Sequence, residues 1–212
     1  MRLVLISDTH GRHNSMPKIP DGDFFIHAGD FSNSGLDAEE VFSFNRWLAR
    51  LPIKRRIVCA GNHDRLFQNK PALAREFLTS ASYLENSGVT IDGISFWGSP
   101  YTPECSSWAF MYPRGPEANK YWDQIPAGLD VLITHGPPYG VLDQTAPGKD
   151  HQGCAELLKA VQNKKPKIHV FGHIHGGAGT FDNGTTRFVN AAYLNERYEP
   201  MEPAGKVRVI DI

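Results

Sequence analysis

Short apolar runs alternate with polar, glycine-containing segments along most of the chain. Several runs are rich in β-branched and aromatic residues and have no polar face, which is typical of buried strands. We predict strands at residues 3–6, 24–26, 56–60, 130–134, 167–171 and 206–212. Two further pairs of runs flank Asp92-Gly93 and Asp182-Asn183-Gly184. These turn residues predict two hairpins, the first with a type I′ turn.

Other segments repeat their apolar residues every three or four positions, as an amphipathic helix does. This spacing predicts a helix over 37–51, through Val41, Phe44, Trp47, Leu48 and Leu51. Asp37 suits the N-cap, and Glu40 three residues later would complete a capping box. Further helices are predicted at 72–79, after a proline, and at 154–161.

The order of these elements favours one layered domain. Strands and helices alternate early, and hairpins occur in the middle and at the end, which predicts an α/β or α+β fold with mixed sheets. We expect residues 1–212 to form a single domain. The segment 98–125 has four prolines and several aromatic residues but little periodicity, and long loops of this kind are often functional.

Polar residues are concentrated where the predicted strands end. Five strand tips combine Asp, Asn or His with glycine: Asp8-Thr9-His10-Gly11, His27-Ala28-Gly29-Asp30, Gly61-Asn62-His63-Asp64, Thr134-His135-Gly136 and Gly172-His173-Ile174-His175-Gly176. In open α/β sheets, ligands bind outside the carboxyl ends of the strands. We therefore expect the five tips to converge on one site.

The donor atoms at these tips suit divalent metal ions. Carboxylate, amide and imidazole groups without thiolates favour ions such as Mn, Fe, Zn or Ni. Asp8 and His10 are two residues apart, as are His173 and His175, so in an extended chain each pair projects to one side. Asp30 is the natural carboxylate to be shared by two metals. Each motif alone is weak, because Asn and Asp also favour ordinary turns. Their joint occurrence in this order indicates a metal site.

Composition narrows the choice of partners. The formal net charge is -1, which gives no general attraction for nucleic acid polymers or anionic membranes. The three cysteines form no C-x-x-C pair, so we expect reduced structural thiols. The apolar run at residues 3–6 is far too short for a signal peptide or a membrane span. We predict a cytoplasmic protein without a membrane partner, and the sequence leaves its oligomeric state open.

The five motifs together resemble the signature of calcineurin-like metallophosphoesterases, from residue 8 to residue 175. A narrower resemblance, to the metallophosphoesterase-domain-containing brain proteins of mammals and their bacterial relatives, covers most of the chain. It is carried by Gly98-Ser99-Pro100, Trp108-Ala109-Phe110, Pro113-Arg114-Gly115, Thr134-His135-Gly136-Pro137-Pro138 and His169-Val170-Phe171-Gly172-His173-Ile174-His175. The resemblance implies a four-layer αββα sandwich: two mixed β-sheets flanked by helices, with the active site at the carboxyl ends of the strands.

The same resemblance implies two divalent metal ions, for which we expect manganese first and iron, nickel, zinc or cobalt as alternatives. Metal one would be held by Asp8, His10, Asp30 and His175, and metal two by Asp30, Asn62, His135 and His173. His63 would face the substrate, and Asp64 would orient it. Some members of the narrower group lack the first histidine of Gly-His-x-His and hydrolyse poorly. This chain keeps His173, so we expect an active two-metal site.

We expect a phosphodiesterase acting on small phosphodiesters or nucleotides, including cyclic nucleotides. Water bridging the two metals would attack the phosphorus in line, and His63 would protonate the leaving alkoxide. A phosphomonoesterase or a nuclease of the same fold is the alternative, and a non-catalytic scaffold is disfavoured by the complete set of ligands.

Several residues are weaker candidates. His13 and Asn14 follow the first motif, and Arg114 lies between a proline and a glycine, so all three are candidate substrate contacts. His27 and His169 lie inside predicted strands and suit core positions. An aromatic group could stack a base or pack in the core: Trp97, Tyr101, Trp108, Phe110 and Tyr112.

Overall fold

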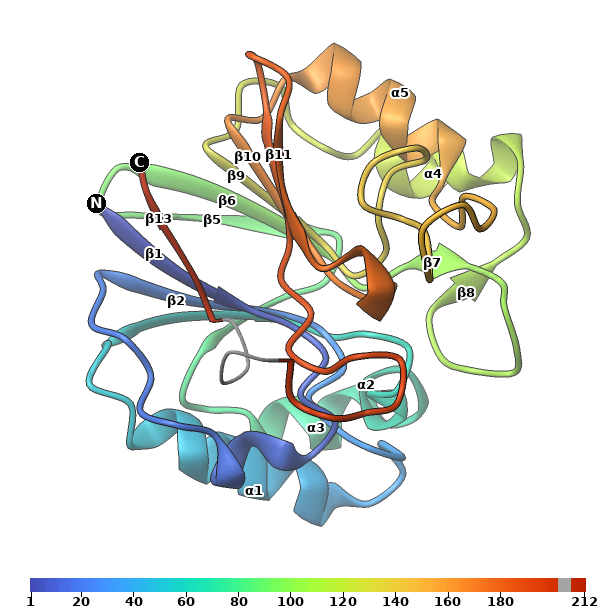
Figure 1. The fold of residues 1–212 in the computed structure, drawn as a ribbon. Helices are drawn as coiled ribbons and strands as arrows, with labels where there is room; N and C mark the ends of the chain where they lie inside the picture. Colours follow the sequence, from blue (N-terminus) through green and yellow to red (C-terminus); the bar gives the residue numbers. More distant parts are fainter. Residues whose placement is uncertain (202–206) are drawn as a thin grey trace.

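Two β-sheets pack against each other in the computed structural model, which describes residues 1–201 and 207–212 (Figure 1). The first sheet has the strand order β13 (Arg208–Asp211), β1 (Arg2–Ile6), β2 (Phe24–Ala28), β3 (Arg55–Cys59) and β4 (Ser82–Leu84). The second has the order β11 (Gly179–Asp182), β12 (Arg187–Asn190), β10 (Ile168–Phe171), β9 (Val131–Thr134), β6 (Ile94–Ser99) and β5 (Ser87–Ile91). Both sheets are mixed: β13, β11 and β5 pair antiparallel, and the other neighbours pair parallel.

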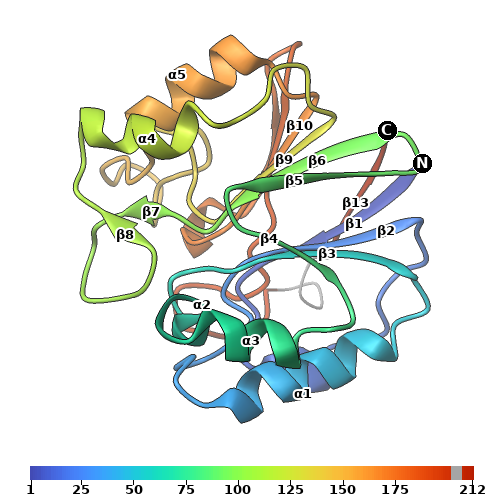
Figure 2. The same ribbon diagram turned by 180° about the vertical axis from the view of Figure 1, so that it is seen from behind.

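Helices cover the outer face of each sheet, as Figures 1 and 2 show from opposite sides. On the first sheet these are α1 (Ala38–Ala49), α2 (Arg65–Asn69) and α3 (Pro71–Phe77). On the second they are α4 (Asn119–Trp122) and α5 (Ala155–Lys164). The remaining elements are a small parallel pair, β7 (Thr102–Pro103) and β8 (Met111–Tyr112), and three 3-10 turns: η1 (Arg12–Ser15), η2 (Pro116–Ala118) and η3 (His175–Gly177). The predicted four-layer αββα sandwich is confirmed.

The alternation of side chains in β1 explains how one strand serves two core layers. Leu3 and Leu5 face the second sheet, whereas Val4 and Ile6 face the helices. All four side chains are fully buried. A strand without a polar face is stable only between two apolar layers, and the sandwich supplies both.

Most predicted elements match the structure, with shifts of a few residues at their ends. In the first hairpin Ile91 pairs with Ile94, and Asp92 and Gly93 both have positive φ, as a type I′ turn requires. The last strand, predicted over 206–212, is seen as β13, and Lys206 lies outside the described residues. The segment predicted as a loop over 98–125 contains β7, β8, η2 and α4.

The capping box predicted for α1 is only half correct. Asp37 accepts a hydrogen bond from the backbone N–H of Glu39 at 2.9 Å and so caps the helix. The carboxylate of Glu40 instead accepts hydrogen bonds from the backbone N–H groups of Asn33, Ser34 and Gly35. Glu40 therefore fixes the loop before the helix rather than the helix end.

His169 in β10 is a core histidine, as predicted. It is fully buried, and its Nε2–H donates to Thr134 Oγ1 at 2.8 Å, because that hydroxyl itself donates to the carbonyl of Gly136. Its Nδ1 has no hydrogen-bond partner among the described residues. Burial lowers the pKa of His169 to about 3, so the ring is neutral in the folded protein.

We expect His169 to make the fold sensitive to acid. The unfolded chain takes up a proton near the ordinary histidine pKa of about 6.5, whereas the folded chain does not, so lowering the pH favours unfolding. Below about pH 6.5 and down to about pH 5, the free energy of unfolding should fall by about 1.4 kcal/mol per pH unit more in the wild type than in His169→Leu. Urea denaturation in the presence of a chelator measures this difference. The same pH dependence in both proteins would contradict the assignment.

Candidate metal centre

The carboxyl ends of β1, β2, β3, β9 and β10 meet where the two sheets approach each other. The backbone joins the sheets at this place: Ser7 N–H donates to the carbonyl of Ala191 at 2.9 Å, and Tyr193 N–H donates to the carbonyl of Ser7 at 2.9 Å. The turns after these strands therefore face one another, and their side chains share one buried space.

Four of the predicted ligands sit on unusual backbone. Asp8, His10, Asp30 and His173 have φ values of 54°, 41°, 56° and 67°. Non-glycine residues in this left-handed region are uncommon and often mark functional turns. The turns also correct the expectation from extended geometry. Asp8 and His10 do meet in one group, but His173 and His175 fall into different groups.

Glycines beside the ligands leave room for them. A side chain on Gly172 would overlap Asp8, and one on Gly61 would overlap Asp30. A Cβ on Gly29 would lie 2.5 Å from His135 Nδ1, and the φ of Gly29 is 105°. The glycines in these motifs therefore allow parts of different strands to approach closely.

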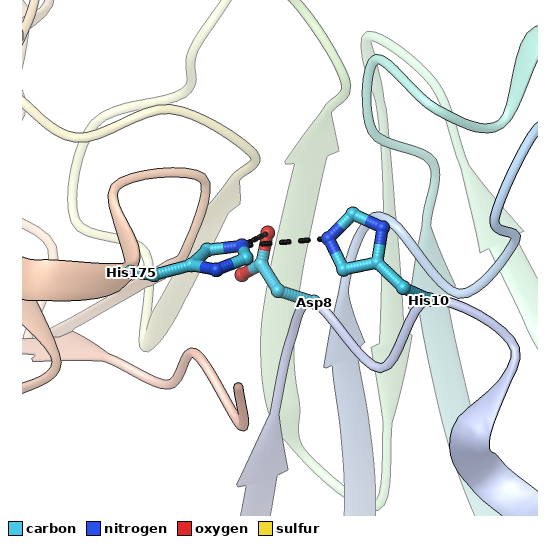
Figure 3. A group of neighbouring side chains, drawn as sticks. All are labelled: Asp8, His10 and His175. Atoms are coloured by element: carbon cyan, nitrogen blue, oxygen red, sulfur yellow. Dashed lines mark hydrogen bonds and ion pairs between the residues drawn. The ribbon is translucent and has the colours of Figure 1, made fainter. Parts of the chain in front are cut away.

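The first group consists of Asp8, His10 and His175 (Figure 3). Nε2 of His175 lies 3.5 Å from Asp8 Oδ1 and 3.4 Å from His10 Nε2. Asp8 is fully buried, and both histidines are nearly so. Donor atoms from opposite sheets thus point at one small volume.

The second group consists of Asp30, His135 and His173, with Asn62 beside them. Nε2 of His135 lies 2.9 Å from Asn62 Oδ1 and 3.4 Å from Asp30 Oδ2. Asp30 also connects the two groups, because its Oδ2 lies 3.8 Å from His10 Nε2. The seven predicted metal ligands are therefore brought together, with Asp30 between the two sets.

The protonation of the imidazoles tests whether this space suits a cation. Nδ1–H of His135 donates to the carbonyl of Ala28 at 3.0 Å, and Nδ1–H of His175 donates to the carbonyl of Asn195 at 2.9 Å. If these rings are neutral, their Nε2 lone pairs face oxygen and nitrogen acceptors. Acceptors that converge in this way repel one another unless a proton or a cation lies among them. Backbone carbonyls that fix the tautomer are also common behind metal-binding histidines.

The electrostatics agree with a site for positive charge. Burial alone would raise the pKa of Asp30, but the charge of His135 and its hydrogen bond outweigh burial and hold that pKa well below its usual range. His175 does the same for the pKa of Asp8. Burial would lower the pKa values of His135 and His175, but the adjacent carboxylates raise both to about 9. Burial lowers the pKa of His10 to about 4. Divalent ions bound by these groups would compensate the same two carboxylates.

His63 lies at the edge of the centre, next to both metal groups. Its backbone N–H donates to Asp30 Oδ1 at 2.7 Å, and its Nδ1–H donates to the carbonyl of Asn33 at 2.6 Å. Because Nδ1 is engaged by Asn33, Nε2 is left for a substrate or a metal. The imidazole of His63 lies in one group with His10 and Asp30.

Asp64 does not orient His63, which corrects the expectation for that residue. Its carboxylate accepts hydrogen bonds from the backbone N–H groups of Asp30 at 2.9 Å, Ser32 at 2.9 Å and Gly61 at 2.8 Å. Burial and the nearby charge of Asp30 raise the pKa of Asp64 to about 7, although these N–H groups lower it. Asp64 therefore holds the two loops that present Asp30 and Asn62, and the carbonyl of Asn33 orients His63.

Trp108 is the member of the predicted aromatic group that covers His63. The two rings stack at 3.9 Å, and the guanidinium of Arg65 lies 4.3 Å from the indole centroid. Trp97, Phe110 and Tyr112 are buried in the core instead, and Tyr101 stacks on Tyr121 at 3.9 Å. Base stacking on all five residues is thus excluded by their packing, and Trp108 is the member of the group that lies beside the candidate metal centre.

The three predicted substrate contacts have other partners. His13 is buried against Phe44 and Trp47, and Asn14 accepts a hydrogen bond from Arg50 at 2.8 Å. Both therefore attach η1 to α1. The guanidinium of Arg114 donates to the carbonyls of Gln152 and Gly153, at 2.6 and 2.8 Å. It fixes a loop, and the expectation of a phosphate contact is corrected.

Comparison with known proteins agrees with this geometry. The calcineurin-like phosphoesterase family matches residues 1–177. The chain belongs to this family. It is therefore a metal-dependent phosphoesterase, and the family implies divalent metal ions for the Asp and His groups described above.

Similar proteins span most of this calcineurin-like chain. Metallophosphoesterase domain-containing protein 1 of Homo sapiens is 41% identical, over 95% of this chain and 69% of its own length. A UPF0046 protein of Caenorhabditis elegans is 40% identical, over 92% of this chain and 71% of its own length.

Solved structures show the same fold at lower identity. TT1561 of Thermus thermophilus has a TM-score of 0.63 at 16% identity, over 89% of this chain and 88% of that one. The phosphopantetheinyl hydrolase PptH of Mycobacterium tuberculosis has a TM-score of 0.57 at 17% identity, over 92% of this chain and 90% of that one. Across the described part of this phosphoesterase, no helix is both long and apolar enough to span a membrane.

Two residues of this phosphoesterase site were missed in the sequence. Asn33 and Asn195 use backbone carbonyls to orient His63 and His175. Their side chains are not required for that contact, so no motif marks them. Only the path of the loop places each carbonyl behind its imidazole.

The shared position of Asp30 predicts a specific metal phenotype. Asp30→Asn keeps a residue that tolerates the left-handed backbone but removes the bridging negative charge, so both ions should be lost or much weakened. Metal analysis after manganese loading and desalting should find about two ions per wild-type chain and far fewer in the variant. Asp37→Asn, an equivalent change at the N-cap of α1, is the control and should keep both ions. Full occupancy in Asp30→Asn would contradict the shared ligand.

Proposed function

We propose that this phosphoesterase is a two-metal phosphodiesterase acting on small phosphodiesters, including nucleotides. Metal one would be held by Asp8, His10, Asp30 and His175, and metal two by Asp30, Asn62, His135 and His173. The observation that supports this most is the position of Asp30, whose carboxylate is near His10 at 3.8 Å and His135 at 3.4 Å. We propose manganese as the ion, because oxygen and imidazole donors without thiolates suit it.

When bound, the ions supply Lewis-acid activation of the phosphoryl group and of the attacking water. Water attacks the phosphorus, the bond from phosphorus to the ester oxygen breaks, and the products are an alcohol and a phosphate monoester. His63 supplies the proton for the leaving oxygen from Nε2, since its Nδ1–H is held by the carbonyl of Asn33 at 2.6 Å. Trp108 stacks on the imidazole and keeps it in this orientation.

The proposed preference for diesters rests on the charge of the phosphate group. A monoester dianion is usually matched by additional cationic side chains, whereas a diester carries one negative charge that two metals can compensate. Two of the arginines nearest the motifs are engaged elsewhere. Arg65 donates to the carbonyl of Ser107 at 2.9 Å beside Trp108, and Arg114 donates to the loop at Gln152 and Gly153.

One observation favours the monoesterase alternative. Arg197 lines a pocket of about 300 Å³ that borders His175, and a cation there could meet a second phosphate charge. Glu196 and Glu199 line the same pocket and offset that charge. We therefore keep the diesterase as the proposal. The near-neutral net charge disfavours a polymer of nucleic acid as substrate.

The role of His63 predicts a dependence on the leaving group. His63→Ala should keep its metals and lose roughly 10²- to 10⁴-fold in rate on esters with a poor leaving group, such as an alkyl ester. The loss should be much smaller with 4-nitrophenolate, which needs little protonation. Steady-state kinetics on both kinds of diester, with metal analysis of the variant, test this. Equal losses on both, or loss of metal, would refute the proton-donor role.

The single charge of a diester predicts a preference between two nitrophenyl esters. kcat/KM should be higher for bis-(4-nitrophenyl) phosphate than for 4-nitrophenyl phosphate, with the same metal at several pH values. The leaving group is identical, so the comparison isolates the charge on the phosphate and the second ester group. A clear preference for the monoester would favour the phosphatase alternative.

A further inference from the structure

The chain that follows β12 forms a tight turn over residues 195–199. Asn195 N–H donates to the carbonyl of Glu199 at 2.8 Å, and Tyr198 N–H donates to the carbonyl of Asn195 at 2.9 Å. Inside the turn, Asn195 Oδ1 accepts from the backbone N–H groups of Arg197 at 2.8 Å and Glu199 at 3.0 Å. One asparagine thus organises the whole turn.

This turn is attached directly to a metal ligand. The carbonyl of Asn195 accepts the Nδ1–H of His175 at 2.9 Å, and the carboxylate of Glu196 accepts the backbone N–H of Gly176 at 2.7 Å. The position of the turn is therefore fixed relative to His175. Any side chain at its tip is held at a defined place beside the metal centre.

Tyr198 is that side chain. Its φ is 59°, a strained value for an aromatic residue, and strain of this kind is retained mostly where it serves a function. The ring lies edge-on to two ligands of the first metal group, 4.8 Å from the ring centroid of His10 and 5.3 Å from that of His175. The residue is 41% exposed, and its hydroxyl makes no hydrogen bond to any other described residue.

His63 also lies next to His10. The ring of His10 lies 4.5 Å from that of His63 at 85°, so Tyr198 and His63 both border His10. Two polar side chains that can donate a proton or a hydrogen bond therefore flank one ligand. The imidazole of His63 is oriented by the carbonyl of Asn33, and the backbone of Tyr198 is held in the turn by the carbonyl of Asn195.

We propose that Tyr198 is a substrate-contacting residue, whose hydroxyl donates a hydrogen bond to a phosphoryl oxygen that stays on phosphorus. This assignment rests on the proposed function and adds a division of roles to it. His63 serves the leaving oxygen, and Tyr198 holds the phosphate on the side of His10 and His175. The ligand that Tyr198 would bind is the tetrahedral phosphate group of the substrate, because that group is the part that lies at the metal centre during the proposed reaction.

The test compares Tyr198→Phe with the wild type. Phenylalanine keeps the ring against His10 and His175 and removes only the hydroxyl. Isothermal titration of manganese-loaded protein with inorganic phosphate should show a loss of roughly ten- to hundredfold in affinity, as expected for a hydrogen bond to a charged group. Metal content should be unchanged. Tyr139→Phe, a change of another exposed tyrosine that contacts His151, is the control and should bind as the wild type does.

The outcomes separate contact from packing. Wild-type phosphate affinity in Tyr198→Phe, with a loss only in Tyr198→Ala, would mean that the ring merely packs on the ligands and would overturn the proposal. Loss of metal from Tyr198→Phe, or no phosphate binding by the wild type, would overturn it as well. If the affinity falls as expected but no ester is hydrolysed by the wild type, the proposed function fails while the contact stands.

Discussion

Two buried carboxylates determine how the rest of this protein is arranged. Asp8 is fully buried and Asp30 is 2% exposed, and buried charges are costly unless partners compensate them. The partners come from both sheets. Asp8 at the end of β1 faces His175 after β10, and Asp30 at the end of β2 faces His135 after β9. The groups that compensate this charge therefore also fix how the ends of the two sheets meet.

Hydrogen bonds from the backbone extend this arrangement to the surrounding loops. Ala28 and Asn195 accept from His135 and His175, and Asn33 accepts from His63. Asp64 joins the turns at Asp30 and Gly61 through their N–H groups. Each of these three imidazoles is thus oriented by a carbonyl of a neighbouring segment. The site is preorganised by the fold, as electrostatic catalysis requires.

The sequence predicts the parts of this site that depend on local pattern. Buried strands are recognisable by their composition, and Asp, Asn and His residues follow directly at their ends, so one cluster of candidate ligands could be foreseen from the pattern. The four layers and the assignment of seven ligands come from the resemblance to the family. Contacts between loops could not be foreseen. Glu40 suits a capping box but binds the loop at Asn33, and His13 follows a ligand motif but packs on Phe44. Tyr198 lies beyond every motif and reaches the centre only because the turn at Asn195 docks on His175.

A pair of metal ions sharing Asp30 between the two sheets would explain the arrangement of the site. Anomalous diffraction from crystals of the manganese-loaded protein tests it most directly. We expect two manganese peaks about 3.5–4 Å apart, with Asp30 between them. One peak should lie beside His10 and His175 and the other beside His135 and His173. A single peak, or two peaks of which only one contacts Asp30, would contradict it.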